Sequence, residues 1–285
     1  MISVVTVQYN HASLTRSAVE SIQAWHNGGF EIIVVDNCST EPGARDATSS
    51  LPGCTVIFNP VNAGFGRANN LGALQATGEI LFFLNNDTRL TGSVFPELEG
   101  YFAAHPRCGV VGPRLVNPDG SPQRSTGKAP TFLSLLGMKR GSDPFSGRRS
   151  SERGWVSGAA LAIRKEAFDA VGGFDERYFM YYEDVDLCAR VRRAGYEIHA
   201  APEISIEHSG GGSQPGGLSP FVRTEYRRSQ LLLFRAHASA ADNALLRLYL
   251  LARFLPERIS PSAGKRNVAS AVLSMALGNP DADRH

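Results

Sequence analysis

The sequence predicts an α/β fold in which a mostly parallel central sheet is flanked by helices and followed by a helical C-terminal extension. Short apolar runs alternate with amphipathic segments through the first part of the chain, which is typical of sheets built from strand–helix–strand units. Polar residues follow several of these runs, as they do at the ligand-binding edge of such a sheet. The last part of the chain mixes Arg with Leu, Phe and Tyr and has few strand signals, which favours helices there.

The elements follow from local patterns. Runs of β-branched, aromatic and aliphatic residues predict strands, which we place at residues 2–9, 31–36, 55–58, 80–84, 109–111 and within 156–164. Leu14, Ala18, Ile22 and Trp25 recur at helical spacing. Further helices are expected at residues 67–76, 165–170 and 183–194, with one or two more at 221–255. Residues 137–154 and 209–220 have the composition of loops, and residues from 279 onward that of a frayed end.

The composition favours a globular protein and gives no sign of a secreted or membrane-spanning one. The chain has 285 residues, of which 42% are hydrophobic, enough to bury a substantial core. Its net charge of +2 gives no reason to expect nucleic acid as a partner. The first residues lack the pattern of a signal peptide, and no apolar stretch is long enough to span a bilayer. We therefore expect a cytoplasmic protein with reduced thiols at its scattered cysteines, Cys38, Cys54, Cys108 and Cys188.

Polar groups at the carboxyl ends of the expected strands are the first candidate site. Gln8, Tyr9 and Asn10 follow the first strand, Asp36 and Asn37 the second, and Asn85, Asn86 and Asp87 the run at 80–84. Asn and Asp are ordinary turn residues after strands, and for any single one that explanation is adequate. Their convergence at one edge favours a binding site, in which Asp87 is suited to a divalent cation shared with a diphosphate.

A cluster of carboxylates is the second candidate site. Asp175 and Glu176 follow a Gly172–Gly173 turn, and Glu183, Asp184 and Asp186 begin an expected helix. Carboxylates at a helix start can simply cap it. Their crowding favours a general base for an acceptor hydroxyl. Like-charged neighbours raise such a pKa whereas a helix N-terminus lowers it, so the sequence leaves the direction open.

Two further features concern His208 and Gly64. His208 precedes a glycine-rich connector. A single histidine is more often a structural or surface residue, but at the hinge of such a loop His208 could join a metal or a diphosphate when the loop closes. Gly64 and Gly66 resemble part of a dinucleotide-binding fingerprint, but the third glycine is missing and the first strand-to-helix turn contains no glycine. We interpret this segment as a turn that lets the backbone approach a ligand.

Taken in order, these motifs resemble those of inverting family-two glycosyltransferases of the GT-A fold, a Rossmann-like architecture, and within them the bacterial rhamnosyltransferase-like members. The matching stretches are residues 4–10, 33–39, 62–72, 84–88 and 172–187. The resemblance implies that Asp184, with Glu183, supplies the catalytic base, that Asp87 and His208 bind Mg²⁺ or Mn²⁺, and that Asp36 contacts the nucleobase. It also implies a donor-nucleotide site that includes Val7, Tyr9, Asn10, Asn62, Gly64, Arg67, Asn69 and Asn86. Asn85 departs from the family's Asp-x-Asp metal motif, which removes a charge from the metal site.

The implied activity is metal-dependent transfer of a hexose, L-rhamnose from dTDP-rhamnose or a sugar from a UDP-sugar, to a glycan or lipid-linked acceptor in cell-wall or surface-polysaccharide assembly. Residues 1–210 are expected to form the catalytic domain, with a nucleotide-binding half at 1–90 and an acceptor-binding half at 91–210, and residues 211–285 the connector and extension. The extension is interpreted as a cover on the catalytic domain; the alternative rests it on the inner face of the plasma membrane. The rival functions are a sugar nucleotidyltransferase, which usually has a glycine-rich basic loop near the first strand, and a catalytically silent sugar-nucleotide or glycan-binding module, which needs no base.

Overall fold

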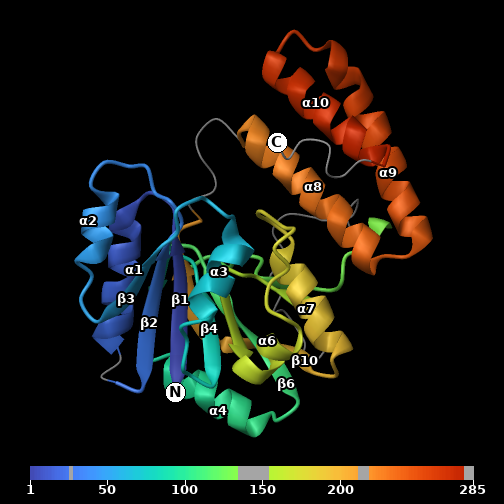
Figure 1. Ribbon diagram of the computed structural model, residues 1–285. Helices are drawn as coiled ribbons and strands as arrows, with labels where there is room; N and C mark the ends of the chain where they lie inside the picture. The colour runs from blue at the N-terminus through green and yellow to red at the C-terminus, as the bar shows by residue number, and fades with distance from the viewer. Residues whose placement is uncertain (26–27, 134–153, 211–217, 279–285) are drawn as a thin grey trace.

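The computed structural model describes residues 1–25, 28–133, 154–210 and 218–278. Its centre is an eight-stranded sheet in the order β3-β2-β1-β4-β9-β6-β10-β5 (Figure 1). The strands are β1 Ile2–Gln8, β2 Phe30–Asp36, β3 Cys54–Phe58, β4 Ile80–Leu84, β5 Thr88–Leu90, β6 Cys108–Val116, β9 Ala160–Arg164 and β10 Glu197–His208, and a separate pair is formed by β7 Thr126–Gly127 and β8 Trp155–Val156. The prediction of a mostly parallel sheet is confirmed.

Parallel pairing places several strand ends at one edge. Strands β3, β2, β1 and β4 are parallel neighbours, and β6 is parallel to β10. Strand β9 runs antiparallel between β4 and β6, and β5 runs antiparallel along β10. The carboxyl ends of β1 and β4 point toward the side on which the C-terminal helices lie (Figure 1). The polar residues that follow these strands therefore lie at one edge of the sheet.

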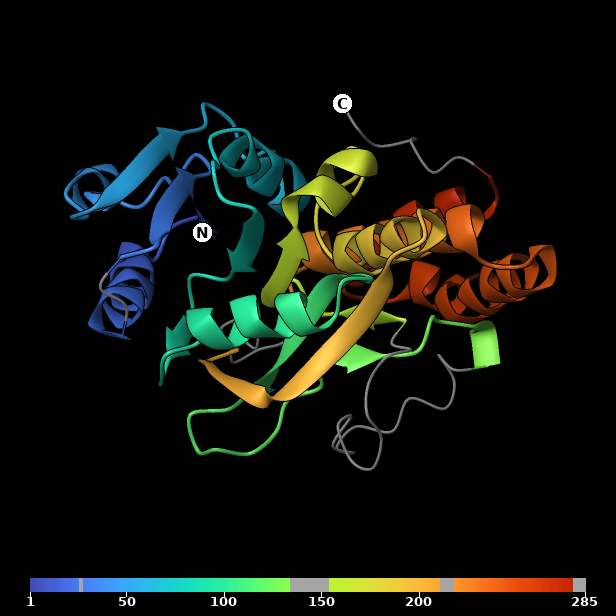
Figure 2. The same cartoon turned by 90° about the horizontal axis from the view of Figure 1, so that it is seen from below.

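Helices cover both faces of the sheet, because side chains of alternate residues in its strands point to opposite faces. Val4 and Phe82 belong to one core and their neighbours Val5 and Phe83 to the other. Figure 2 shows α1 and α4 on one face and α3, α6 and α7 on the other. Their bounds are α1 Ala12–Trp25, α2 Ala44–Ser49, α3 Phe65–Ala73, α4 Phe95–Ala104, α6 Lys165–Ala170 and α7 Glu183–Arg193.

The helix expected from Leu14, Ala18, Ile22 and Trp25 is present, but its buried face is rotated. Ala18 and Ile22 are buried, whereas Leu14 and Trp25 are 37% and 50% exposed. The indole nitrogen of Trp25 instead donates to the carbonyl oxygen of Leu90 at 3.1 Å. This contact joins the end of α1 to β5.

The C-terminal extension is helical, as predicted, and has a core of its own. It contains α8 Pro220–His237, α9 Ala240–Phe254, the 3₁₀ helix η1 Leu255–Ile259 and α10 Ala263–Ala276. Leu231, Leu246 and Val272 are among the buried residues that join α8, α9 and α10. A smaller cluster of Tyr178, Val185 and Leu233 packs α8 against α7. Most of the loop expected at 137–154, much of the connector at 209–220 and the end from 279 lie outside the described residues.

Candidate active site

A cavity of about 490 Å³ lies where the carboxyl end of β4 meets the start of α7. Its volume falls within the range of small-ligand sites. The residues that line it come from both halves of the sheet and from the extension: Phe65, Asn85, Arg124, Pro130, Trp155, Ser157, Gly158, Ala159, Met180, Tyr181, Tyr182, Glu183, Asp184, Val185, His208 and Tyr226. Three residues predicted for the site line this cavity: Glu183, Asp184 and His208. Asn85, which directly follows β4, lines it as well.

Asp184 is held in place by backbone donors. Its Oδ2 accepts a hydrogen bond of 2.9 Å from the N–H of Gly158, and its Oδ1 accepts one of 2.8 Å from the N–H of Val185. Burial raises the pKa of Asp184, and these two hydrogen bonds oppose that rise by favouring the charged form. The carboxyl group is therefore fixed in orientation at the wall of the cavity.

Glu183 has a different environment. Its side chain is 7% exposed, and its Oε2 has no hydrogen-bond partner among the described residues. Burial, and then the charge of Asp184, raise the pKa of Glu183 to about 8. The two N–H groups that Asp184 accepts favour its charged form, and that charge in turn favours the proton on Glu183.

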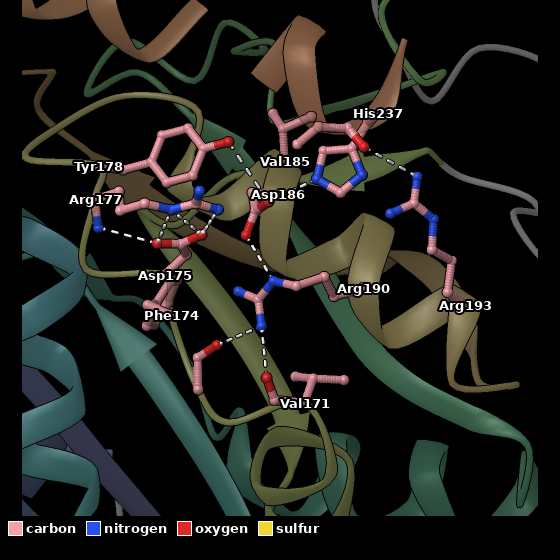
Figure 3. A network of polar contacts seen from close by, with 12 residues as sticks. Val171, Phe174, Asp175, Arg177, Tyr178, Val185, Asp186, Arg190, Arg193 and His237 are labelled. Atoms are coloured by element: carbon pink, nitrogen blue, oxygen red, sulfur yellow. Dashed lines mark hydrogen bonds and ion pairs between the residues drawn. The ribbon is translucent and has the colours of Figure 1, made fainter. Parts of the chain in front are cut away.

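The other carboxylates of the predicted cluster form ion pairs away from the cavity. Asp186 is buried, and its two oxygens contact Arg190 Nε at 2.7 Å and His237 Nε2 at 2.6 Å (Figure 3). Arg190 also donates to the carbonyl oxygens of Val171 and Gly173. These contacts tie α7 to the Gly172–Gly173 turn on one side and to the end of α8 on the other. They hold the first turn of α7, and with it Asp184, in a fixed position.

Asp175 and Glu176 also have basic partners. Asp175 binds Arg177 at 2.6 Å, and this contact lowers its pKa against the effect of burial. Glu176 Oε2 lies 3.3 Å from Arg67 Nε, and both side chains are more than half exposed. The predicted carboxylate cluster therefore consists of two groups. Glu183 and Asp184 face the cavity, whereas the other three form ion pairs outside it: Asp175, Glu176 and Asp186.

The antiparallel pairing of β5 and β10 brings Asp87 and His208 together. Thr88 is the register partner of His208, and Asp87 precedes it in the chain. His208 Nε2 lies 3.2 Å from Asp87 Oδ1, with 15% and 13% of the respective side chains exposed. The described residues contain no group of three or more His, Cys, Asp or Glu side chains that could hold a metal ion. Mg²⁺ is usually held by one or two carboxylates with further oxygens from a diphosphate and water, so Asp87, with His208 beside it, fits a divalent ion of this kind.

Asp36 and Gln8 lie opposite each other in the β1–β2 register. Gln8 Nε2 donates to Asp36 Oδ2 at 2.7 Å, and the N–H of Ser39 donates to Asp36 Oδ1 at 2.8 Å. Asp36 is 3% exposed, and it is not among the residues that line the cavity. It lies at the same edge of the sheet, two strands away from β4.

The loop around Gly64 connects the nucleotide half to α7. Asn62 Oδ1 accepts from Asn37 Nδ2 at 2.9 Å and from the N–H of Gly64 at 3.1 Å. Gly64 has φ +84°, and a Cβ there would lie 2.3 Å from the carbonyl oxygen of Phe179. Phe65 N donates to that same oxygen at 2.8 Å. At Gly64 the structure shows a close approach to Phe179, in the segment that precedes α7. The approach of this turn to a ligand stays a prediction.

The remaining residues of the predicted donor site lie around the same edge. Asn10 Oδ1 accepts from the N–H groups of Thr40 and Glu41, and Tyr9 beside it is 47% exposed. Asn69 is buried and donates to the carbonyl oxygen of Phe65 within its helix, and Asn86 donates to Thr15 Oγ1. Val7 is half-buried near the end of β1, in register with Val35. The donor-binding roles of these residues stay predictions.

Sequence reasoning missed several polar and aromatic groups of the site. Arg124 lies 5.9 Å from the ring centroid of Trp155 at the cavity wall. Tyr226 reaches the cavity from α8, where it accepts a 2.8 Å hydrogen bond from Tyr182. Gln123 contacts His208. No spacing rule connects them to the motifs; the aromatic content of the extension was the one available signal.

All four cysteines are free, and Cys108 and Cys188 are buried. Within the described part of the chain, no helix is both long enough and apolar enough to cross a membrane.

Comparison with known proteins identifies the family. A model described as glycosyl transferase family 2 matches residues 3–172, and one described as the N-terminal domain of galactosyltransferase matches residues 137–209. An N-acetylglucosaminyl-diphospho-decaprenol L-rhamnosyltransferase of Mycobacterium tuberculosis is 29% identical over 233 residues, covering 73% of this chain and 76% of the relative. The rhamnosyltransferase WbbL of Escherichia coli is 26% identical over 223 residues, covering 73% of this chain and 83% of that protein.

Solved structures agree on the fold. The mannosyltransferase PcManGT from Pyrobaculum calidifontis, in complex with GDP-Man and Mn²⁺, matches with a TM-score of 0.61 and 17% identity, covering 98% of this chain and 81% of the other. Residues 1–349 of S. aureus TarS match with a TM-score of 0.58 and 18% identity, covering 98% and 80%. Because the family model spans more than half of the sequence and the sheet matches these neighbours, the chain belongs to glycosyl transferase family 2 and has the GT-A fold.

Proposed function

We propose that this protein is an inverting, metal-dependent glycosyltransferase that moves L-rhamnose from dTDP-rhamnose to a hydroxyl of a glycan or lipid-linked acceptor in cell-wall or surface-polysaccharide assembly. The observation that carries the proposal is the cavity in which Asp184 lies together with Asn85 and His208, the latter beside Asp87. Relatives named as rhamnosyltransferases support the choice of sugar. Neighbours solved with GDP-Man or UDP-GlcNAc keep other nucleotide sugars, UDP-sugars first, as alternatives.

In the proposed reaction Asp184 Oδ removes the proton of the acceptor hydroxyl as that oxygen attacks the anomeric carbon. A carboxylate within hydrogen-bond reach of the hydroxyl is a sufficient general base. The nucleoside diphosphate leaves from the opposite face of the sugar, so the anomeric configuration inverts. Glu183, protonated beside Asp184, keeps a second negative charge away from the base.

Asp87 and His208 are the residues that would hold Mg²⁺ or Mn²⁺. When bound, the ion would offset the negative charge that develops on the departing diphosphate. Asn85 and Asn86 precede Asp87 without adding charge, so the site depends on His208 for its second side-chain ligand. Asp36 is proposed to contact the nucleobase, with Tyr9 and Arg67 nearby, and residues 1–90 to form the donor-binding half of a catalytic domain that ends near residue 210.

The acceptor is proposed to arrive from an anionic membrane surface on which one end of the extension rests. The Arg223–Glu257 ion pair of 3.2 Å joins the start of α8 to η1. Phe221, Leu255 and Ile259 at this end are 55%, 61% and 87% exposed. Three exposed basic residues lie in and after this stretch: Arg258, Lys265 and Arg266.

Charge and proximity support this arrangement. Residues 218–278 contain nine Lys or Arg and three Asp or Glu, a net of +6, whereas the whole chain has a net charge of +2. Exposed apolar side chains beside basic ones are suited to the interface of anionic lipids. Phe221 also packs against Phe179, at a ring separation of 5.4 Å, next to the segment that lines the cavity. An acceptor held in the bilayer is proposed to reach the cavity past this pair of rings.

A thermal-shift screen tests the enzymatic function. dTDP-rhamnose, UDP-sugars and GDP-mannose are each added with MgCl₂ or MnCl₂, and a true donor stabilises the folded state by mass action, about 2.7 kcal/mol at one hundred times its Kd. We expect dTDP-rhamnose to give the largest rise in Tm. A larger rise with a UDP-sugar would reassign the donor, and no rise with any nucleotide sugar would overturn the proposal.

Vesicle flotation tests the membrane contact. The full chain should float with phosphatidylglycerol vesicles and not with phosphatidylcholine vesicles, and the double variant Leu255→Asp/Ile259→Asp should lose flotation. Leu74→Asp is a matched control, because Leu74 is 79% exposed on the nucleotide-binding half. Equal flotation of the double variant and the control would refute this contact.

A further inference from the structure

Gln123 binds His208 at two points. Its Nε2 donates to the backbone carbonyl oxygen of His208 at 2.6 Å, and its Oε1 lies 2.8 Å from His208 Nδ1. Nε2 also donates to Asn117 Oδ1 at 2.6 Å, and the N–H of Gln123 donates to the carbonyl oxygen of Leu115 at the end of β6. Backbone and side chain of Gln123 are therefore both fixed.

These contacts determine the orientation of the Gln123 amide. A backbone carbonyl oxygen can only accept a hydrogen bond, so the atom of the amide 2.6 Å from His208 O must be the NH₂ nitrogen. The amide oxygen must then face His208 Nδ1. Because an amide oxygen can only accept, Nδ1 must carry the hydrogen.

The tautomer of His208 follows. A neutral imidazole has one N–H, and with the hydrogen on Nδ1 the lone pair of Nε2 points outward. In the neutral ring that lone pair faces Asp87 Oδ1 at 3.2 Å, whereas a ring protonated on both nitrogens would donate to the same oxygen as an ion pair. Two electron-pair donors facing each other are the arrangement that a divalent cation binds, with the far nitrogen of the histidine oriented by an outer hydrogen-bond partner.

We propose that Gln123 is a positioning residue that holds His208 in the Nδ1–H tautomer, so that Nε2 and Asp87 together present a preformed pair of ligands to a divalent cation. This inference rests on the metal-dependent function proposed above. Gln123 touches neither the cation nor the substrate; it acts through His208. Outer partners of this kind typically contribute about 10–100-fold to metal affinity.

Histidine ¹⁵N NMR of the uniformly labelled full chain tests the tautomer without metal. Spectra recorded at a pH where His208 is neutral, and assigned with a His208→Ala variant, should show Nδ1 protonated and Nε2 bare. Gln123→Met, of similar length but without the amide, should shift the population toward the Nε2–H form. A wild-type His208 protonated on Nε2 overturns the inference, even if the Gln123→Met variant fails to fold.

Mn²⁺ binding, measured by electron paramagnetic resonance of the free ion with dTDP or UDP present, tests the consequence. Gln123→Met should weaken Mn²⁺ binding about 10–100-fold, whereas Ser125→Ala in the same segment should not. In a His208→Ala background, Gln123→Met should have no further effect, as a double-mutant cycle requires of a residue that acts through another. Unchanged affinity in Gln123→Met overturns this inference alone; no Mn²⁺ binding by the wild-type chain overturns the proposed metal dependence as well.

Discussion

The N–H of Gly158 donates a 2.9 Å hydrogen bond to Oδ2 of Asp184, which joins the segment between β8 and β9 to the first turn of α7. A Cβ on Gly158 would lie 3.5 Å from the Cβ of Asp184 and 3.1 Å from the ring of Phe65. A backbone donor at this position orients the carboxylate without a basic side chain that would lower its basicity. The proposed base therefore keeps a pKa above the usual range, as burial dictates.

Replacement of Asp184 by Asn should remove the base and keep its shape. The amide oxygen can still accept one of the two backbone N–H groups, and the many other contacts of α7 should retain its first turn. The amide cannot take the acceptor proton. We expect the rate of sugar transfer to fall by at least about 100-fold, with nucleotide binding measured by calorimetry nearly unchanged. Glu176→Gln, at an exposed carboxylate outside the cavity, serves as control. Wild-type turnover by Asp184→Asn would refute the assignment of the base.

The raised pKa of Glu183 predicts a pH-dependent stability. The folded state holds the Glu183 proton up to about pH 8, whereas the unfolded chain releases it near the ordinary carboxyl value of 4.5. The contribution to stability is therefore complete below about pH 4.5, declines as the pH rises, and is lost above about pH 8. Glu183→Gln has no proton to lose. The unfolding free energies of this variant and of the wild type are measured by denaturant titration from pH 5 to pH 9. The difference between them should change in favour of the variant as the pH rises to about 8, and should stay constant above that pH. A difference that does not vary with pH would contradict the buried, protonated state.

Removal of divalent metal should abolish transfer. Chelation with excess EDTA is expected to eliminate product formation, and MnCl₂ or MgCl₂ added beyond the chelator should restore it. Asp87→Ala should weaken metal binding more than the about 10–100-fold expected of an outer residue, because it removes a direct ligand. Full activity after exhaustive chelation would exclude the metal from the reaction.

Much of the sheet could be predicted because its strands carry local signals. The strands at Ile2–Gln8, Phe30–Asp36 and Ile80–Leu84 are rich in aliphatic and aromatic residues and are largely buried on both faces. Strand β10 was not predicted, since Pro202 interrupts it and its pairing with β6 shifts register between Ala201 and Ser205. Such an irregularity breaks the alternation by which a strand is detected.

The site could be predicted only where its residues belong to motifs. Glu183 and Asp184 are adjacent in sequence, and the parallel-sheet rule placed Asp87 at the ligand edge. The contact between Asp87 and His208 depends on the antiparallel pairing of β5 with β10, which no local pattern encodes. Gln123 lies 85 residues from His208, and a single Gln in a loop carries no signal of its own.

Gly64→Ala should destabilise the junction between the nucleotide half and α7. The φ of +84° is unfavourable for alanine, and the added Cβ would lie 2.3 Å from the carbonyl oxygen of Phe179, a backbone atom that cannot rotate away. We expect a loss of about 1–3 kcal/mol in unfolding free energy, measured by urea titration, together with weaker binding of nucleotide sugars. Gly100→Ala is the matched control, since Gly100 lies within α4, has no neighbour within 4 Å of an added Cβ and should gain about 0.5–1 kcal/mol. If both variants were equally stable, the close approach of Gly64 to Phe179 would not hold the two segments together.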